Sequence, residues 1–198
     1  GHVHSKESVQ AFIRDALAAD PEVVILVDEA YHEFVDDPAY ASMLPLIATQ
    51  PRVFVTRTFS KIYGLAGLRV GYAFGQPATL ARMEKFRLSN GIGALAQVAA
   101  LASLADTAQM QQEQAKNREA RAFTVKWFTD NGYTVVPTNT NFALVNIRRD
   151  SRVFRDACQR EGVLVGRPFP PLTQHTRISF GTMDEMRRAV EVFRRVLV

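Results

Sequence analysis

The stretch that decides the fold is residues 56–72, which read TRTFSKIYGLAGLRVGY. An apolar run at Val53–Thr56 predicts a strand that leads into it, and Arg69–Phe74 predicts a strand that leads out. Glycines in such a loop allow positive φ or a close approach to a ligand. Lys61, held on this loop, can be partly removed from water, which makes its amine nucleophilic. The alternative is a glycine-rich connector with an ordinary surface lysine, and for a lone Ser-Lys pair that alternative is the better one.

A second stretch upstream, residues 23–31 with the sequence VVILVDEAY, favours the functional interpretation. Its continuous apolar run is typical of a buried strand in a parallel sheet. Ligands of open α/β sheets bind outside the carboxyl ends of the strands, so we expect Asp28 at the ligand edge. Taken alone, Asp28 would be better explained as a helix N-cap or a surface acid. The two stretches together indicate a ligand site.

Together the two stretches resemble a known family of enzymes. The sequence DEAY at residues 28–31, followed by SKIYGLAGLRVGY at residues 60–72, is similar to the fold-type I pyridoxal-phosphate enzymes. Within them the chain resembles the class I/II aminotransferases, and most closely the histidinol-phosphate aminotransferase group. Lys61 and Arg69 have the spacing of eight that fits this pattern. The resemblance is much more specific for the fold and the cofactor than for the substrate.

The resemblance implies pyridoxal 5'-phosphate as the cofactor and assigns its chemistry to three residues. Lys61 is implied to form a Schiff base with the cofactor and then to carry a proton between the substrate Cα and the aldehyde carbon. Asp28 is implied to lie against the pyridine nitrogen, whose protonated form its negative charge stabilises. Tyr31 is implied to hydrogen-bond the ring hydroxylate.

Five further residues are candidates for binding the anionic groups of the cofactor and the substrate. Ser60 and Arg69 are implied to hold the cofactor phosphate, with Thr58 a weaker candidate. Arg177, within TRISFG at residues 176–181, resembles the family's arginine for the substrate α-carboxylate, and its alternative is a surface arginine at a strand end. Arg167 is a second substrate-binding candidate, for a phosphate or another carboxylate, and a structural salt bridge explains it equally well.

The resemblance also implies an α/β fold in two parts. Residues 1–115 are expected to be the C-terminal part of the cofactor-binding large domain, a mainly parallel sheet with helices. Residues 116–198 are expected to form a small α+β C-terminal domain with a long connecting helix. Similar aminotransferases carry a long segment before this point, so we expect the chain to be the C-terminal portion of an enzyme. Its sheet edge is then expected to pair with another chain or to belong to a longer protein.

Local signals give the expected order of elements. Helices are expected at residues 6–19, 77–88, 107–130 and 151–161, with a break at residues 90–93 and with Gly132 and Gly162 at helix ends. A capping box at Thr182–Glu185 predicts the start of a last helix. Besides the strands already named, strands are expected at residues 133–136, 141–147, 163–165 and 177–181.

Composition argues against several function classes. The chain has 198 residues, of which 47% are hydrophobic and 22% charged, as in ordinary globular proteins, and a cytoplasmic location is expected. Its single cysteine, Cys158, allows no internal disulfide, and its four histidines lack metal-ligand spacing, so no metal is expected. No apolar run reaches about 18 residues, so no membrane association is expected. Residues 148–198 hold eleven Arg and six Asp or Glu, a charge that can attract an anionic substrate, while no nucleic-acid-binding motif accompanies it. A solvated helix surface is the better explanation for Arg187, Arg188, Arg194 and Arg195.

Three functions remain open. The first is an aminotransferase that moves an amino group between an amino acid, histidinol phosphate or an aromatic one, and 2-oxoglutarate. The second is a decarboxylase of a phosphorylated amino acid on the same scaffold, because the orientation of the Cα bonds to the ring decides which bond breaks. The third is a non-catalytic truncated fragment of such an enzyme. The resemblance implies a homodimer, since active sites of this family borrow residues from a second subunit.

Overall fold

The computed structural model describes residues 1–87 and 91–197. The chain divides into two compact units, one of Val3–Gln111 and the other of Gln112 to the C-terminus together with Gly1–His2. The division lies near the predicted one between residues 115 and 116. The identity of the units as a large and a small domain stays a prediction.

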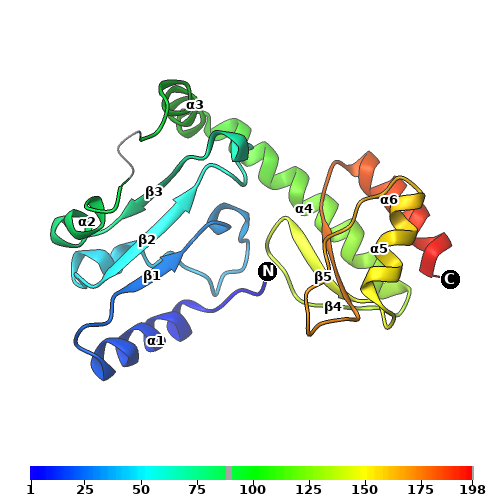
Figure 1. Ribbon diagram of the computed structural model, residues 1–198, viewed down its shortest axis with the longest axis horizontal. Coiled ribbons are helices and arrows are strands. Elements are labelled where there is room, and N and C mark those ends of the chain that lie inside the picture. The colour runs from blue at the N-terminus through cyan, green and yellow to red at the C-terminus, as the bar shows by residue number, and fades with distance from the viewer. Residues whose placement is uncertain (88–90, 198) are drawn as a thin grey trace. The chain divides into compact units, whose positions relative to one another are not determined.

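The first unit is built on a three-stranded sheet in the order β1-β2-β3 (Figure 1). Its strands are β1 (Ile25–Asp28), β2 (Val53–Thr58) and β3 (Gly71–Phe74). β1 runs parallel to β2, as predicted, and β3 runs antiparallel to it. The antiparallel pairing departs from a mainly parallel sheet because the short connection from β2 to β3 has no crossover helix, which a parallel pair requires. The predicted start of the last strand at Arg69 is two residues early, since Arg69 has a left-handed conformation with φ 55°.

Helices and short 3-10 turns surround this sheet. They are α1 (Lys6–Ala19), η1 (His32–Phe34), η2 (Leu44–Ala48), η3 (Ala66–Leu68), α2 (Pro77–Glu84) and α3 (Ala94–Ala105). The predicted bounds of α1 are confirmed, because Ser5 caps it by accepting a hydrogen bond from the amide of Ser8 at 3.2 Å. The predicted end of the next helix at Leu88 and the first residue of the break, Asn90, lie outside the described residues.

Two apolar clusters stabilise the first unit. Ile13 of α1 packs against Val53 and Val55 of β2, so the helix covers one face of the sheet. A second cluster joins Phe59 and Val70, which flank the lysine loop, to buried alanines of α3. The loop that carries Lys61 is therefore anchored at both ends by buried side chains.

The second unit is an antiparallel sheet, in the order β4-β5-β6, packed with helices (Figure 1). Its elements are α4 (Thr107–Asp130), whose first residues up to Gln111 belong to the other unit, β4 (Thr134–Val135), β5 (Phe142–Asn146), α5 (Ser151–Arg160), β6 (His175–Ser179) and α6 (Met183–Leu197). Gly132 and Gly162 follow helices with φ 76° and 77°, as expected of C-terminal helix caps. The capping box is confirmed, because the Thr182 hydroxyl accepts from the Glu185 amide and the Glu185 carboxylate accepts from the Thr182 amide.

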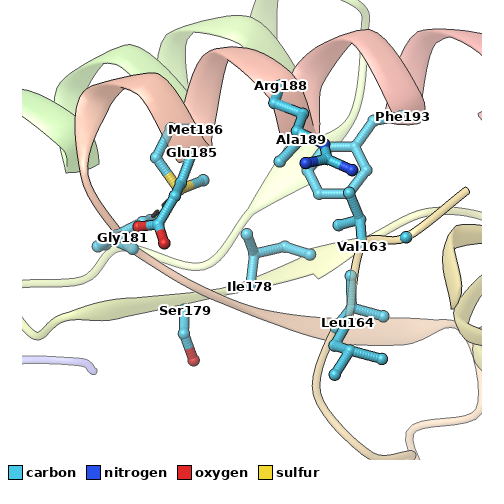
Figure 2. Close-up of a pocket in the computed structure, with 13 residues that line it drawn as sticks. Val163, Leu164, Ile178, Ser179, Gly181, Glu185, Met186, Arg188, Ala189 and Phe193 are labelled. Carbon is cyan, nitrogen blue, oxygen red and sulfur yellow. Dashed lines mark hydrogen bonds between the residues drawn. The ribbon is translucent and has the colours of Figure 1, made fainter.

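The predicted strand at Val163–Val165 is wrong for a local reason. Only the Gly166 amide donates to β6, to the carbonyl oxygen of Arg177 at 2.9 Å. Beyond that point a cavity of about 370 Å³ is lined by Gly162–Val165, the end of β6 and the start of α6 (Figure 2). Leu164 accordingly remains 81% exposed. A short apolar run whose backbone has no neighbouring strand to pair with does not form a strand.

Asp150 caps α5, and its removal is expected to weaken the second unit. Its carboxylate accepts hydrogen bonds from the amides of Arg152 at 2.7 Å and Val153 at 3.4 Å. Asp150→Ala should lower the free energy of unfolding by about 1 kcal/mol, because two helix amides lose their partner. Urea denaturation measures this change. Asp150→Asn keeps the acceptor and should stay near wild type, so equal losses in both variants would contradict the capping role.

Cys158 is fully buried in the core of the second unit. Burial raises the pKa of its thiol from 9.0 to about 12, because the apolar surroundings disfavour the thiolate. The folded state thus favours the neutral thiol, and the corresponding stability is present below pH 9 and lost as the pH rises above it.

Native Cys158 is therefore expected to resist alkylation by iodoacetamide at pH 8 and to react fully in urea. Mass spectrometry after timed labelling measures both rates. Rapid stoichiometric labelling of the native chain would contradict the buried placement.

Among the described residues, no helix has the length and apolar character needed to cross a bilayer.

Candidate active site

A pocket of about 600 Å³ lies at the carboxyl ends of β1 and β2, within the first unit. Five of the residues predicted for the site line it: Asp28, Thr58, Ser60, Lys61 and Arg69. The two strands bring these side chains together because β1 and β2 are parallel and in register, with Asp28 beside Thr56. This is the edge at which ligands of parallel sheets bind.

Asp28 is the last residue of β1, and its side chain is exposed at the pocket. Its Oδ1 accepts a hydrogen bond from the Ala30 amide at 3.1 Å, which fixes the turn that leaves the strand. It does not cap the following 3-10 helix, whose N-cap position is Tyr31. Among the described residues, none donates a hydrogen bond to the other carboxylate oxygen of Asp28, which leaves that oxygen open to a ligand.

Lys61 stands on the turn after β2, where it is half-buried. Its carbonyl oxygen accepts from the Gly64 amide at 2.9 Å, and Gly64 has φ 70°, which a residue with a side chain rarely adopts. The amine Nζ lies 5.0 Å from the centre of the Tyr31 ring. Lys61 and Tyr31 therefore meet above the end of β1, although Tyr31 itself does not line the pocket.

The hydroxyls of Thr58 and Ser60 and the guanidinium of Arg69 form a polar cluster on the loop that carries Lys61. The Arg69 guanidinium donates to the Ala66 carbonyl at 2.9 Å and to Ser60 Oγ at 3.4 Å. Thr58 Oγ1 accepts from the Ser60 amide at 3.1 Å. A cation and hydroxyls on one loop are the donors that a phosphate prefers. Arg69 has φ 55°, a conformation that costs a non-glycine residue energy and often marks a binding site.

Arg167 and Arg177 belong to the second unit, where they share an aromatic neighbour. The Arg177 guanidinium lies 5.4 Å from the Phe142 ring centre and 5.7 Å from that of Phe169. Arg167 lies 4.8 Å from the same Phe169 ring. The buried Nε of Arg177 has no hydrogen-bond partner among the described residues. Neither arginine forms an ion pair within the described ranges, which leaves both positive charges uncompensated by a neighbouring carboxylate.

Thr56, Arg57 and Tyr72 also line the pocket and were not predicted as site residues. Burial, and then the negative charge of Glu33, raise the pKa of Tyr72, so its hydroxyl stays protonated at neutral pH. Burial, the largest single effect, would lower the pKa of Arg57, but its hydrogen bond with Glu29 and the negative charges around it together outweigh burial and raise that pKa. The signal that could have identified these two residues is the strand register, which pairs Arg57 of β2 with Tyr72 of β3.

Comparison with known proteins gives the family. The profile described as "Aminotransferase class I and II" matches residues 1–193. Histidinol-phosphate aminotransferase 1 of Nitrosococcus oceani is 36% identical over 198 residues, covering 98% of this chain and 52% of that protein. Histidinol-phosphate aminotransferase of Akkermansia muciniphila is 38% identical over 189 residues, covering 95% of this chain and 52% of that protein.

A solved structure agrees with these relatives. Histidinol-phosphate aminotransferase from Sinorhizobium meliloti, crystallised in complex with pyridoxal-5'-phosphate, superposes with a TM-score of 0.89 and 29% identity. The match covers 100% of this chain and 54% of that one. The chain spans about half the length of the curated relatives that it matches. With the profile matched over nearly all of its residues, the chain belongs to the class I and II aminotransferase family.

Proposed function

We propose that this chain carries the lysine and much of the cofactor site of a pyridoxal-phosphate-dependent aminotransferase. The observation that carries the proposal is the convergence of Lys61, Asp28, Ser60 and Arg69 on one pocket. An amine, a carboxylate, a hydroxyl and a guanidinium are the groups that an aldehyde, a ring nitrogen and a phosphate require. The donor set therefore fits pyridoxal 5'-phosphate.

Each residue of the pocket has a distinct role in this proposal. Lys61 would hold the cofactor through its aldehyde, and its free amine would move a proton to and from the substrate Cα. Asp28 holds a proton on the ring nitrogen through its negative charge. Ser60 and Arg69 bind the phosphate, Thr58 orients Ser60, and Tyr31 lies next to the lysine amine. The bound cofactor supplies an electron sink that weakens the bonds at Cα.

Substrate recognition is proposed for the second unit. Arg177 offers a buried, unpartnered Nε and is held against two aromatic rings, which suits a substrate carboxylate. Arg167 is proposed to bind a phosphate or a second carboxylate. The names of the relatives support histidinol phosphate as the amino donor, and we propose 2-oxoglutarate as the acceptor. An aromatic amino acid is the other candidate donor.

The two units are proposed to be parts of larger domains. Residues 3–111 correspond in this proposal to part of a fold-type I large domain, and residues from 112 onward to the small α+β domain. A homodimer is proposed as the working assembly, since the family is expected to share its active sites between subunits. The cytoplasmic location stays a prediction.

Product analysis tests the proposal. The purified chain and pyridoxal phosphate are incubated in two separate reactions. One contains histidinol phosphate and 2-oxoglutarate and is assayed for glutamate, and the other contains O-phosphothreonine, a phosphorylated amino acid with a carboxyl group on Cα, and is assayed for CO₂. Glutamate formation supports the aminotransferase, and CO₂ release would replace it with the decarboxylase. Absence of both products despite cofactor binding would support the non-catalytic fragment. Phenylalanine in place of histidinol phosphate separates the two candidate donors.

A further inference from the structure

A buried ion pair borders the candidate site, where its cation lines the pocket, and it has no part in the proposed chemistry. Its carboxylate is Glu29, whose side chain is 3% exposed, and its cation is Arg57, whose side chain is 16% exposed. The distance between Arg57 Nη2 and Glu29 Oε2 is 2.9 Å. Charges removed from water to this degree are costly and rarely occur without a specific partner.

The donors around the Glu29 carboxylate come from two segments that are distant in sequence, residues 42–43 and Arg57 of β2. Oε1 accepts from the Met43 amide at 2.7 Å. Oε2 accepts from Ser42 Oγ at 2.8 Å, and from Arg57 Nε at 3.1 Å and Nη2 at 2.9 Å. Arg57 Nη2 also donates to Ser42 Oγ at 3.1 Å. The carboxylate is thus fixed by two donors of one guanidinium and two groups of the segment that leads into η2, which leaves it a single orientation.

The Glu29–Arg57 ion pair lies where β1, β2 and β3 border the pocket. Glu29 directly follows Asp28, and its amide donates to the Thr56 carbonyl at 2.9 Å. Arg57 lies between two pocket residues of β2, Thr56 and Thr58, and is in register with Tyr72 of β3. A shift of the pair would therefore move Asp28 and the start of the lysine loop relative to each other.

A contribution to the stability of the fold does not by itself explain why a buried ion pair is present here. Replacing a buried ion pair by uncharged residues of similar size is often neutral or stabilising, because the charges no longer have to be desolvated. Hydrogen-bonded charges do, however, restrict their neighbours to one geometry. Binding groups need such support, since a small displacement of a contacting side chain weakens binding strongly.

We propose that Glu29 and Arg57 are positioning residues, which hold Asp28 and Tyr31 in place against Lys61. The proposal rests on the proposed function, because the geometry that it preserves is that of the cofactor pocket. Neither residue is a catalytic residue, since each acts through its neighbours in the strands.

The test compares an uncharged double variant with a variant of a matched arginine that lies just before β2. In Glu29→Gln with Arg57→Met, the glutamine still accepts from the Met43 amide, while both charges are gone. The control is Arg52→Met. Arg52 precedes β2 at its other end and donates to the carbonyls of Leu17 and Asp20, at 3.0 and 2.7 Å.

Three quantities are measured on each protein: the urea midpoint, the dissociation constant for pyridoxal phosphate, and hydrogen exchange of the amides of Glu29, Ala30 and His32. The double variant should keep a urea midpoint near wild type, bind the cofactor about tenfold more weakly and exchange these amides about tenfold faster. Arg52→Met should lower the midpoint and leave the dissociation constant unchanged. Arg57→Lys, which keeps the charge, should recover part of the affinity.

Two results would overturn the proposal. One is a double variant with wild-type affinity and wild-type amide exchange. The other is an Arg52→Met control that loses as much affinity as the double variant, since the effect would then follow stability alone. If the wild-type chain itself does not bind pyridoxal phosphate, the proposed function fails for this chain, and the exchange rates in the cofactor-free protein decide the positioning role.

Discussion

Lys61→Ala is expected to abolish the absorbance band at about 420 nm that develops when pyridoxal phosphate is added to the chain. The band requires an imine between the cofactor aldehyde and an amine, and alanine supplies no amine. Lys61 is the only lysine among the residues that line the pocket in the described part of the chain, so no neighbour can replace it. A titration followed by absorbance, with borohydride reduction and peptide mass mapping, measures the loss and locates the modified residue.

Surface lysines also react slowly with aldehydes, so the comparison needs a matched control. Lys126 is exposed and pairs with Asp130 at 2.8 Å in the second unit. Lys126→Ala should retain the full band and the modification at Lys61. A band of wild-type intensity in Lys61→Ala would show that the cofactor attaches elsewhere and would remove the central residue of the proposed site.

Arg69→Met should weaken the binding of pyridoxal phosphate by about tenfold to a hundredfold. The reason is the loss of a charged hydrogen-bond donor next to Ser60, from which its guanidinium lies 3.4 Å away. Pyridoxal, which lacks the phosphate, should bind both proteins equally. Absorbance titrations with the two compounds measure the difference.

The conservative substitution sharpens this experiment. Arg69→Lys keeps a positive charge but loses the planar fork, so its affinity should fall between those of wild type and Arg69→Met. Equal weakening of pyridoxal and pyridoxal phosphate in Arg69→Met would instead indicate a distorted loop. A distorted loop could result from the substitution because Arg69 has a left-handed backbone conformation. This result would contradict a direct contact between Arg69 and the phosphate.

The sequence by itself was enough for the features that depend on nearby residues. The bounds of α1 and of the long helix α4, and the capping box of α6, follow from the residues that begin and end these helices. The grouping of Asp28 with the lysine loop also followed from the sequence. Two short motifs at the ends of neighbouring strands suffice, because parallel strands bring their carboxyl ends to one edge.

Other features were decided only by tertiary structure. The direction of β3 depends on how the chain closes after the lysine loop, and the absence of a strand at Val163–Val165 depends on a cavity beside β6. Glu29 and Arg57 stand in the two motifs, 28 residues apart, yet no local pattern reveals that they pair or that Ser42 joins them. Packing between distant segments fixes these partners, and it is the desolvation of the two charges in that packing that makes their pairing obligatory.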